Sequence, residues 1–310
     1  MVKVDLITGF LGAGKTTFLK KYADYLLRQG QKIGILEYDH GAVNVDMLLL
    51  QELRGENCEL EMLSAACDAD CHRRRFKTKL ISMGMSGYDR VIIEPSGVFD
   101  VDEFFDALRE YPLENWYEIG SVITVVDAEL EDTLTPSGEF LLASQAANAG
   151  CILLSRVRLA DETQLAGTTD HLKRALAGIG CKRDVDRLIL ARDWDTLTDA
   201  DLDRLTRCGY HFSDYVKTTR SAEDDFSSCY FLNLPLTCAQ AKAKAAALFA
   251  DTGYGSILRV KGFLEENGQW YQLNATRNEI TLAPIPIGQY AMIVIGTKLN
   301  EKAIDTLMHS

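Results

Sequence analysis

Residues 9–16 read GFLGAGKT, a spacing of glycines, a lysine and a threonine that can hold phosphate groups. Gly9 and Gly14 allow the backbone to curl so that successive N–H groups point at phosphate oxygens. Lys15 supplies a positive charge for the β- and γ-phosphates, and Thr16 supplies a hydroxyl for Mg²⁺. An apolar run precedes the motif and a helical pattern follows it, as this motif requires. The sequence therefore predicts a nucleoside-triphosphate site with Mg²⁺.

The phosphate site is expected to include the whole loop and the first turn of the following helix. The N-terminus of that helix adds a partial positive charge. Lys15 is also a catalytic candidate because its charge can neutralise the phosphoryl group that is transferred. The residues expected to bind the phosphates are Gly9, Leu11, Gly12, Ala13, Gly14, Lys15, Thr16 and Thr17.

A second signature lies at residues 88–97, YDRVIIEPSG, where an apolar strand delivers an acid to its carboxyl end. Glu94 can hold Mg²⁺ through a water or orient the attacking water, so we expect it to be catalytic and, with Thr16, a magnesium ligand. Gly97 allows the backbone to approach the γ-phosphate, so this loop could sense hydrolysis. The alternative is that Glu94 only ends a strand.

The segments around these motifs alternate between two kinds of pattern. Strands are expected at 32–37, 60–63, 90–94, 122–126, 151–154 and 187–191, and helices at 17–28, 102–109, 140–149 and 170–176. Nearly continuous Val, Ile and Leu in strands that alternate with helices is typical of a parallel sheet covered by helices on both faces. The sequence thus predicts an α/β fold of the P-loop NTPase type.

The alternating pattern fades after Trp194, and this sets the predicted domain organisation. A P-loop NTPase domain is expected over residues 1–195 and a polar linker over 196–225. A small α+β domain is expected over 226–310, with a helix at 239–249 and short strands separated by glycine and asparagine.

Composition narrows the classes of protein to which the chain can belong. The 310 residues are 47% hydrophobic and 25% charged, with a net charge of −12, which argues against nucleic-acid binding. No apolar run is long enough to span a membrane, and the first apolar residues run into the phosphate loop instead of a cleavage site. A cytoplasmic location is therefore expected. The eight cysteines are interpreted as buried thiols or metal ligands instead of disulfides.

Five stretches together resemble the CobW family of phosphate-loop GTPases, relatives of the nickel-insertion GTPases HypB and UreG. They read TGFLGAGKTT, YDHGAVNVD, LSAAC, VIIEPSG and LRVKGF. The resemblance covers nearly the whole chain and implies a C-terminal domain of the CobW type. It also implies a slow NTPase that couples GTP hydrolysis to delivery of a metal or cofactor to a client metalloenzyme. Segments 37–46 and 64–76 would be the switch and metal-relay region, and a homodimer is one assembly open to such a chain.

The family's Cys-x-Cys-Cys metal motif is only partly present. Aligned on the preceding Leu-Ser, Cys67 is kept, but the second and third cysteines are replaced by Ala69 and Asp70. Thiolates at that spacing make a site selective for soft ions. A mixed site for Zn, Co or Ni could be rebuilt from Glu37, Cys67, Cys71 and His72. The same stretch could equally be a solvated loop.

The family's guanine-reading motif, Asn-Lys-x-Asp, is also altered. Residues 155–158 read Ser-Arg-Val-Arg. Arg156 can stack its stem on a base, as lysine does, and is expected to bind the nucleotide. Arg158 cannot accept a hydrogen bond, so the physical basis for preferring GTP is lost. We expect weak base selectivity or use of ATP.

The sequence leaves two functions open. The first is an Mg²⁺-dependent, GTPase-like switch that assists metal or cofactor delivery to a client enzyme. The alternative is a nucleotide-gated activator or regulator of a metal- or corrinoid-dependent enzyme, with no metal cargo. A small-molecule kinase is disfavoured because neither the EPSG loop nor the C-terminal domain is a kinase feature.

Overall fold

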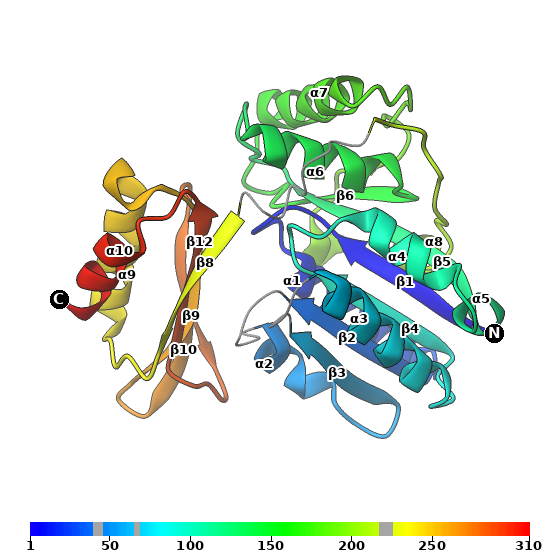
Figure 1. Cartoon of the computed structure of the whole chain (residues 1–310), viewed down its shortest axis with the longest axis horizontal. Coiled ribbons are helices and arrows are strands. Elements are labelled where there is room, and N and C mark those ends of the chain that lie inside the picture. The colour runs from blue at the N-terminus through cyan, green and yellow to red at the C-terminus, as the bar shows by residue number, and fades with distance from the viewer. Residues whose placement is uncertain (40–45, 65–68, 217–225) are drawn as a thin grey trace. The chain divides into compact units, whose positions relative to one another are not determined.

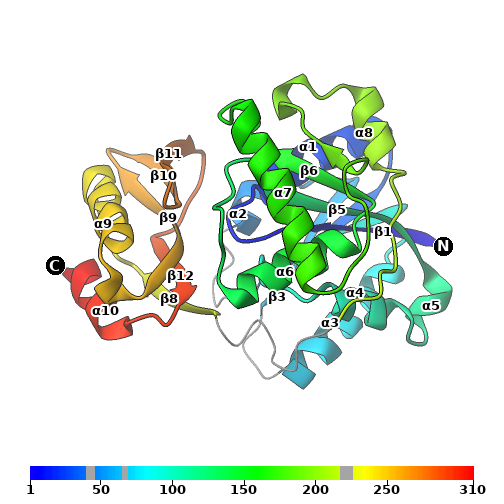
Figure 2. The same cartoon turned by 90° about the horizontal axis from the view of Figure 1, so that it is seen from above.

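The computed structural model describes residues 1–39, 46–64, 69–216 and 226–310. Contacts divide the chain into two compact units, drawn in Figures 1 and 2. The first unit comprises Met1–His40 and Leu50–Glu223, and the second comprises Gly41–Leu49 and Asp224–Ser310. No helix within the described residues combines the length and the apolar character needed to cross a membrane.

The first unit is built on a seven-stranded parallel sheet. Its strand order is β3-β2-β4-β1-β5-β6-β7. The strands are β1 (Val2–Thr8), β2 (Ile33–Asp39), β3 (Cys58–Ser64), β4 (Arg90–Pro95), β5 (Tyr117–Asp127), β6 (Cys151–Ser155) and β7 (Ile189–Leu190). Because β1 lies between β4 and β5, the loops that follow β1 and β4 meet at the carboxyl edge of the sheet.

Helices cover both faces of this sheet, as Figure 1 shows. One face packs on α1 (Lys15–Arg28) and α8 (Asp199–Leu205). The other face packs on α3 (Ala69–Gly84), α4 (Val101–Leu108), α5 (Leu113–Trp116), α6 (Pro136–Ala147) and α7 (Glu162–Gly178). The predicted α/β fold with a parallel sheet covered on both sides is confirmed.

Two segments differ from the sequence-based expectations. Residues 196–216 were expected to be linker, but α8 lies there, and its Leu202 and Leu205 are buried in the same cluster as Phe18 of α1. Helix α7 begins eight residues before the expected start at 170 because Asp161 and Gln164 form a capping box. Local capping there outweighs the weak helix propensity of the Gly and Thr residues that follow.

A polar cluster is buried near the amino ends of β1 and β4. The Asp5 carboxylate accepts hydrogen bonds from the Tyr22 hydroxyl (2.7 Å) and the Ser121 backbone N–H (2.8 Å), and it pairs with Arg90. Burial raises the pKa of Asp5, and the adjacent Arg90 charge partly opposes that rise. The buried carboxylate is therefore tolerated because donors surround it.

The second unit is an α+β domain, as expected. Its antiparallel sheet has the order β11-β10-β9-β12-β8. The strands are β8 (Phe226–Leu232), β9 (Ser256–Glu266), β10 (Gln269–Ala275), β11 (Ile280–Ile285) and β12 (Ala291–Thr297). Helices α9 (Cys238–Ala250) and α10 (Glu301–His309) pack on this sheet through Ala241, Leu248 and Ile304.

The short helix α2 (Asp46–Leu50) begins in the second unit. Its Leu48 and Leu49 pack against Phe263 of β9 and Ile293 of β12. The second unit therefore contains a piece of chain from between β2 and β3.

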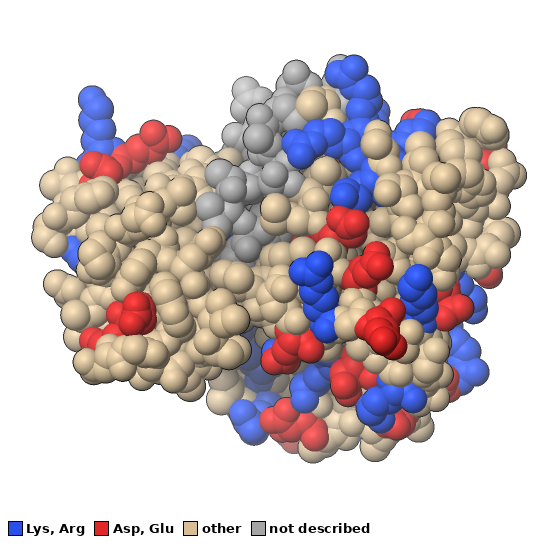
Figure 3. Space-filling model, turned by 90° about the horizontal axis from the view of Figure 1, so that it is seen from below, with Lys and Arg blue, Asp and Glu red and all other residues tan. Residues whose placement is uncertain are grey.

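Charged side chains of both signs lie side by side on the face drawn in Figure 3. On that face, Lys and Arg do not form a continuous basic surface.

Candidate functional site

The loop after β1 has the backbone shape that phosphate binding requires. Gly9 has φ of +148°, and a Cβ there would lie 2.2 Å from the carbonyl oxygen of Val125, so only glycine fits. The buried Lys15 donates from Nζ to the Gly9 carbonyl at 3.1 Å, which closes the loop on itself. A phosphate group in the loop would replace the neutral Gly9 carbonyl as the acceptor for Lys15. Because the phosphate is charged, its hydrogen bond with Lys15 would be stronger.

Helix α1 begins inside this loop without a side-chain cap. Its N-cap residue, Gly14, has φ of +98° and offers no side chain to the first N–H groups. The first turn contains the buried Lys15 and Thr16 and the exposed Thr17, with no acidic residue. The N–H groups at the start of a helix attract anions when no side chain satisfies them.

Thr16 and Glu94 connect the phosphate loop to β4. The Thr16 hydroxyl donates to Oε1 of Glu94 at 2.7 Å, and both side chains are buried. With its proton given to Glu94, the hydroxyl oxygen keeps lone pairs for a cation. Hydroxyl and carboxylate oxygens are the hard ligands that Mg²⁺ prefers, so this pair fits the predicted magnesium site.

Gly97 lies directly against the phosphate loop. A Cβ at this position would be 2.6 Å from the backbone nitrogen of Leu11, so the two backbones touch. The Gly97 carbonyl accepts a hydrogen bond from Nε2 of Gln145 in α6 at 3.3 Å. The structure thus brings the EPSG loop and the phosphate loop together.

Glu37 lies beside Glu94 instead of beside His72. Glu37 of β2 is in register with Glu94 of β4, so both side chains leave the sheet on the α1 face, with Cα atoms about 5 Å apart. Glu37 is buried as well. A second carboxylate therefore stands next to the predicted magnesium ligands.

His72 lies on the opposite face of the sheet. Its Nδ1 is 3.0 Å from the Tyr38 hydroxyl, which donates to Oε1 of Glu103 at 3.2 Å. The Tyr38 hydroxyl thus lies between the His72 imidazole and the Glu103 carboxylate. Tyr38 is held by stacking on Phe76, with ring centroids 5.1 Å apart.

The predicted transition-metal set is not assembled as a whole in the described residues. Cys67 lies outside them, and the partly buried Cys71 is on α3, next to His72. Glu37 and His72 are separated by the sheet. Across residues 1–39, 46–64, 69–216 and 226–310, no three His, Cys, Asp or Glu side chains form a group that could hold a metal ion. This ligand set stays a prediction.

Comparison with protein families decides what kind of chain this is. A family model described as the nucleotide-binding domain of CobW/HypB/UreG matches residues 3–180. The chain belongs to the CobW/HypB/UreG family. The resemblance drawn from the sequence motifs is confirmed, and the matched residues contain both the phosphate loop and the EPSG loop.

Among curated relatives of this family member, the zinc chaperone YjiA of Escherichia coli K12 is 26% identical over 288 residues, covering 86% of this chain and 83% of YjiA. The zinc-regulated GTPase metalloprotein activator 1 of Schizosaccharomyces pombe is 22% identical over 208 residues, covering 65% of this chain and 49% of the activator.

Two solved structures are similar to the chain at low TM-scores. The Zn(II)-bound YjiA GTPase from E. coli gives a TM-score of 0.36 at 20% identity, over 99% of this chain and 98% of YjiA. The hydrogenase maturation factor HypB from Archaeoglobus fulgidus gives 0.40 at 18% identity, over 66% of this chain and 88% of HypB. With TM-scores below 0.5, neither bears on the site.

In this CobW/HypB/UreG chain, Arg156 contacts the phosphate loop from the end of β6. Its Nη1 donates to the Gly12 carbonyl at 3.2 Å and pairs with Asp127, while its own φ is +54°. Arg158, whose side chain is 70% exposed, lies 3.6 Å from the Asp195 carboxylate. The position expected to read guanine thus carries a cation that is already paired.

Trp194 is a contact of the phosphate loop that the sequence motifs did not reveal. A Cβ on Gly14 would lie 3.2 Å from Cη2 of its indole, and its Nε1 donates to the Leu154 carbonyl at 2.9 Å. The ring also packs on Phe18 of α1. Its only sequence signal is its place just after the last strand of the sheet, where loops meet at the carboxyl edge.

Proposed function

We propose that this CobW/HypB/UreG protein is a slow, Mg²⁺-dependent nucleoside triphosphatase that works as a switch. The observation that carries the proposal is the Thr16–Glu94 hydrogen bond, which joins the phosphate loop to the acid at the end of β4. Family membership and the uncapped start of α1 support it. Phosphoryl chemistry of this kind depends on positioning and electrostatics, which these groups can supply.

The proposed roles follow from the contacts. Lys15 exchanges the Gly9 carbonyl for the β- and γ-phosphates, and the N–H groups of the loop and of the first turn of α1 hold the remaining oxygens. Thr16 and Glu94 would hold Mg²⁺, which supplies charge neutralisation on the phosphates. Glu94 also orients the attacking water. Gly97, in contact with the phosphate loop, transmits the loss of the γ-phosphate to the EPSG loop.

The switch is proposed to serve metal delivery to a client metalloenzyme. YjiA is named a zinc chaperone and the S. pombe relative a metalloprotein activator, and this chain shares a family with them. Glu37 lies beside Glu94, so a metal bound by Glu37 would lie next to the site of nucleotide hydrolysis. A transition-metal cargo, Zn, Co or Ni, would use Glu37 or the stretch that carries Cys67, Cys71 and His72.

Base preference is proposed to be weak. Arg158 cannot accept the hydrogen bonds that distinguish guanine from adenine, and its charge is directed to Asp195. Arg156 can still place its stem against either purine while it holds Gly12. ATP would therefore be accepted beside GTP.

A second candidate is a nucleotide-gated regulator without metal cargo. The observation that favours it is the separation of Glu37 and His72 on opposite faces of the sheet, with His72 bound into a hydrogen-bonded row with Tyr38 and Glu103. In that case the row would stabilise α3 and α4 and hold no cargo.

One experiment tests both candidates. Purified protein is titrated with GTP and with ATP, each with and without Mg²⁺, and Zn²⁺ is then titrated into the nucleotide-bound and nucleotide-free forms. We expect Mg²⁺-dependent binding of both nucleotides and one zinc per chain, with zinc affinity lowered at least ten-fold in Cys67→Ala. Zinc binding that is absent in every state favours the regulator, and absence of nucleotide binding rejects both.

A further inference from the structure

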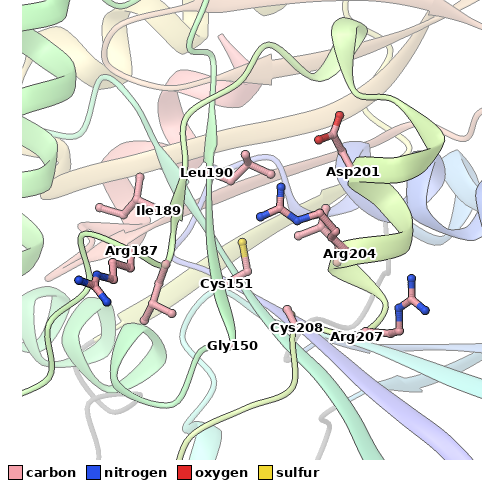
Figure 4. Close-up of a pocket in the computed structure, with 11 residues that line it drawn as sticks. Gly150, Cys151, Arg187, Ile189, Leu190, Asp201, Arg204, Arg207 and Cys208 are labelled. Atoms are coloured by element: carbon pink, nitrogen blue, oxygen red, sulfur yellow. The ribbon is translucent and has the colours of Figure 1, made fainter.

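A cavity of about 390 Å³ opens between α8 and strands β6 and β7 in the first unit, shown in Figure 4. It begins at Gly150 and Cys151, where β6 starts, whereas the phosphate loop lies at the carboxyl end of the sheet. Four residue steps along β6 separate Cys151 from Ser155, about 13 Å. The cavity is therefore distinct from the nucleotide site.

The cavity has an apolar floor. Cys151, Ile189, Leu190 and Leu205 line it, and its volume lies within the range of small-molecule sites. Burial raises the pKa of the Cys151 thiol to about 12, so this thiol stays protonated and contributes only packing.

Three arginines stand around this floor, in a chain whose net charge is −12. Arg204 extends from α8 toward β7 and the Cys151 sulfur, while Arg187 and Arg207 stand on opposite sides (Figure 4). Arg207 is paired with Asp203.

The remaining two arginines are not neutralised. The guanidinium groups of Arg187 and Arg204 make no ion pair and no hydrogen bond with the residues that the structure describes. The cavity's one carboxylate, Asp201, is occupied by Arg192 and by the backbone and hydroxyl of Thr198. Two uncompensated guanidinium groups beside an apolar floor attract an anion with two negative charges.

The geometry points to a second ligand site here, for a small phosphate monoester with an apolar or aromatic body. Arg204, whose guanidinium lies over the floor, would bind the phosphate dianion, Arg187 at the edge of the cavity would add positive charge, and the floor around Cys151 and Leu205 would cover the body. A phosphate monoester fits better than a carboxylate because it carries the two charges that the two arginines balance.

The test uses phenyl phosphate as the probe and benzoate as the comparison, with binding measured by calorimetric titration of the full chain. The pocket variant is Arg187→Ala/Arg204→Ala. The matched control is Arg54→Ala, which removes an exposed arginine outside the cavity. Lys15→Ala identifies binding at the phosphate loop. The three substituted arginines, Arg54, Arg187 and Arg204, are exposed, so we expect the variants to keep their fold. Thermal unfolding checks this.

The site predicts that phenyl phosphate binds at least ten-fold more tightly than benzoate. Its Kd should rise at least ten-fold in the pocket variant and change less than two-fold in Arg54→Ala and Lys15→Ala. The proposal is overturned if wild-type protein does not bind phenyl phosphate, if benzoate binds equally well, or if only Lys15→Ala removes binding. None of these outcomes depends on whether the chain hydrolyses nucleotide, so the proposed function is tested separately.

Discussion

Glu37 and Glu94 stand in register on adjacent parallel strands, both buried and both on the face that carries the phosphate loop. Two buried carboxylates at this separation repel each other unless a cation or a donor lies between them. Thr16 supplies a donor to Glu94. We therefore propose that the pair provides negative charge for a divalent ion at the start of α1.

Loss of the Glu94 carboxylate and loss of the Glu37 carboxylate are expected to change different kinetic parameters of hydrolysis. Glu94→Gln should lower kcat about 10²-fold because the group that orients water is lost. Glu37→Gln should raise the Mg²⁺ concentration for half-maximal activity about ten-fold. Losing a residue that supports the ligands of a metal site typically lowers metal affinity by about that factor. Steady-state assays over an Mg²⁺ series measure both. Glu118→Gln, exposed at the start of β5, is the control and should match wild type. Equal Mg²⁺ dependence of wild type and Glu37→Gln would place Glu37 outside the magnesium site.

A methyl group on Gly97 should damage the phosphate loop. In Gly97→Ala the new Cβ would lie 2.6 Å from the backbone nitrogen of Leu11, so one backbone must move. We expect nucleotide affinity to fall at least about ten-fold, or about 1.4 kcal/mol, in calorimetric titration. Gly167→Ala in α7, with nothing within 4 Å of the new methyl, should bind nucleotide normally and gain about 0.5–1 kcal/mol of stability. Normal nucleotide binding by Gly97→Ala would show that the contact between the loops is dispensable.

The Asp5–Arg90 pair should control stability and its pH dependence. Arg90→Met leaves a buried carboxylate without its cation and should lower the free energy of unfolding by about 3–5 kcal/mol. The double variant Asp5→Asn/Arg90→Met buries no charge at this pair, so its free energy of unfolding should fall less than that of Arg90→Met. Denaturant unfolding at pH 7 measures both.

The sign of the pH effect follows from the raised pKa of Asp5. A carboxyl group whose pKa is higher in the folded state binds more protons there, so stability falls as pH rises through that range. Removing Arg90 raises this pKa further. The deficit of Arg90→Met should therefore shrink as pH is lowered from 7 to 5, while the double variant shows no such trend. A deficit that is constant between pH 5 and pH 7 would mean that Asp5 binds no more protons in the folded variant than in the folded wild type, and would contradict this prediction.

Base selectivity should be weak in the wild type and recoverable at one position. GTP and ATP are expected to bind within about five-fold of each other because Arg158 offers no acceptor. Arg158→Asp restores the acceptor and should raise the preference for GTP at least about ten-fold. Arg158→Ala, which removes the cation but adds no acceptor, serves as the control; Lys21 still pairs with Asp195 in both. A strong GTP preference in the wild type would mean that another group reads the base.

Local patterns were enough to predict the fold and the two loops that meet at the carboxyl edge of the sheet. The apolar strand before Gly9 and the acid at Glu94 are adjacent in sequence to the elements that position them, so spacing alone indicates their place. The early start of α7 also has a local cause, the capping box at Asp161, but its signal lies outside the apolar periodicity.

Partners that depend on register could not be read from the sequence. The predicted ligand set places Glu37 with His72, yet alternation along β2 sends Glu37 and Tyr38 to opposite faces of the sheet, and His72 lies on the Tyr38 face. Trp194 follows a two-residue strand far along the chain, and only the strand order β1-β5-β6-β7 brings it to Gly14. Such relationships are fixed by the sheet as a whole.

The packing of Trp194 against Gly14 also gives the protein an optical reporter. The chain has three tryptophans, and the other two are Trp116 in α5 and Trp270 in β10. In Trp116→Phe/Trp270→Phe protein, all indole emission would come from a ring in contact with the phosphate loop and α1. Filling and emptying of that loop could then be followed by fluorescence in real time, with no label and no modified nucleotide.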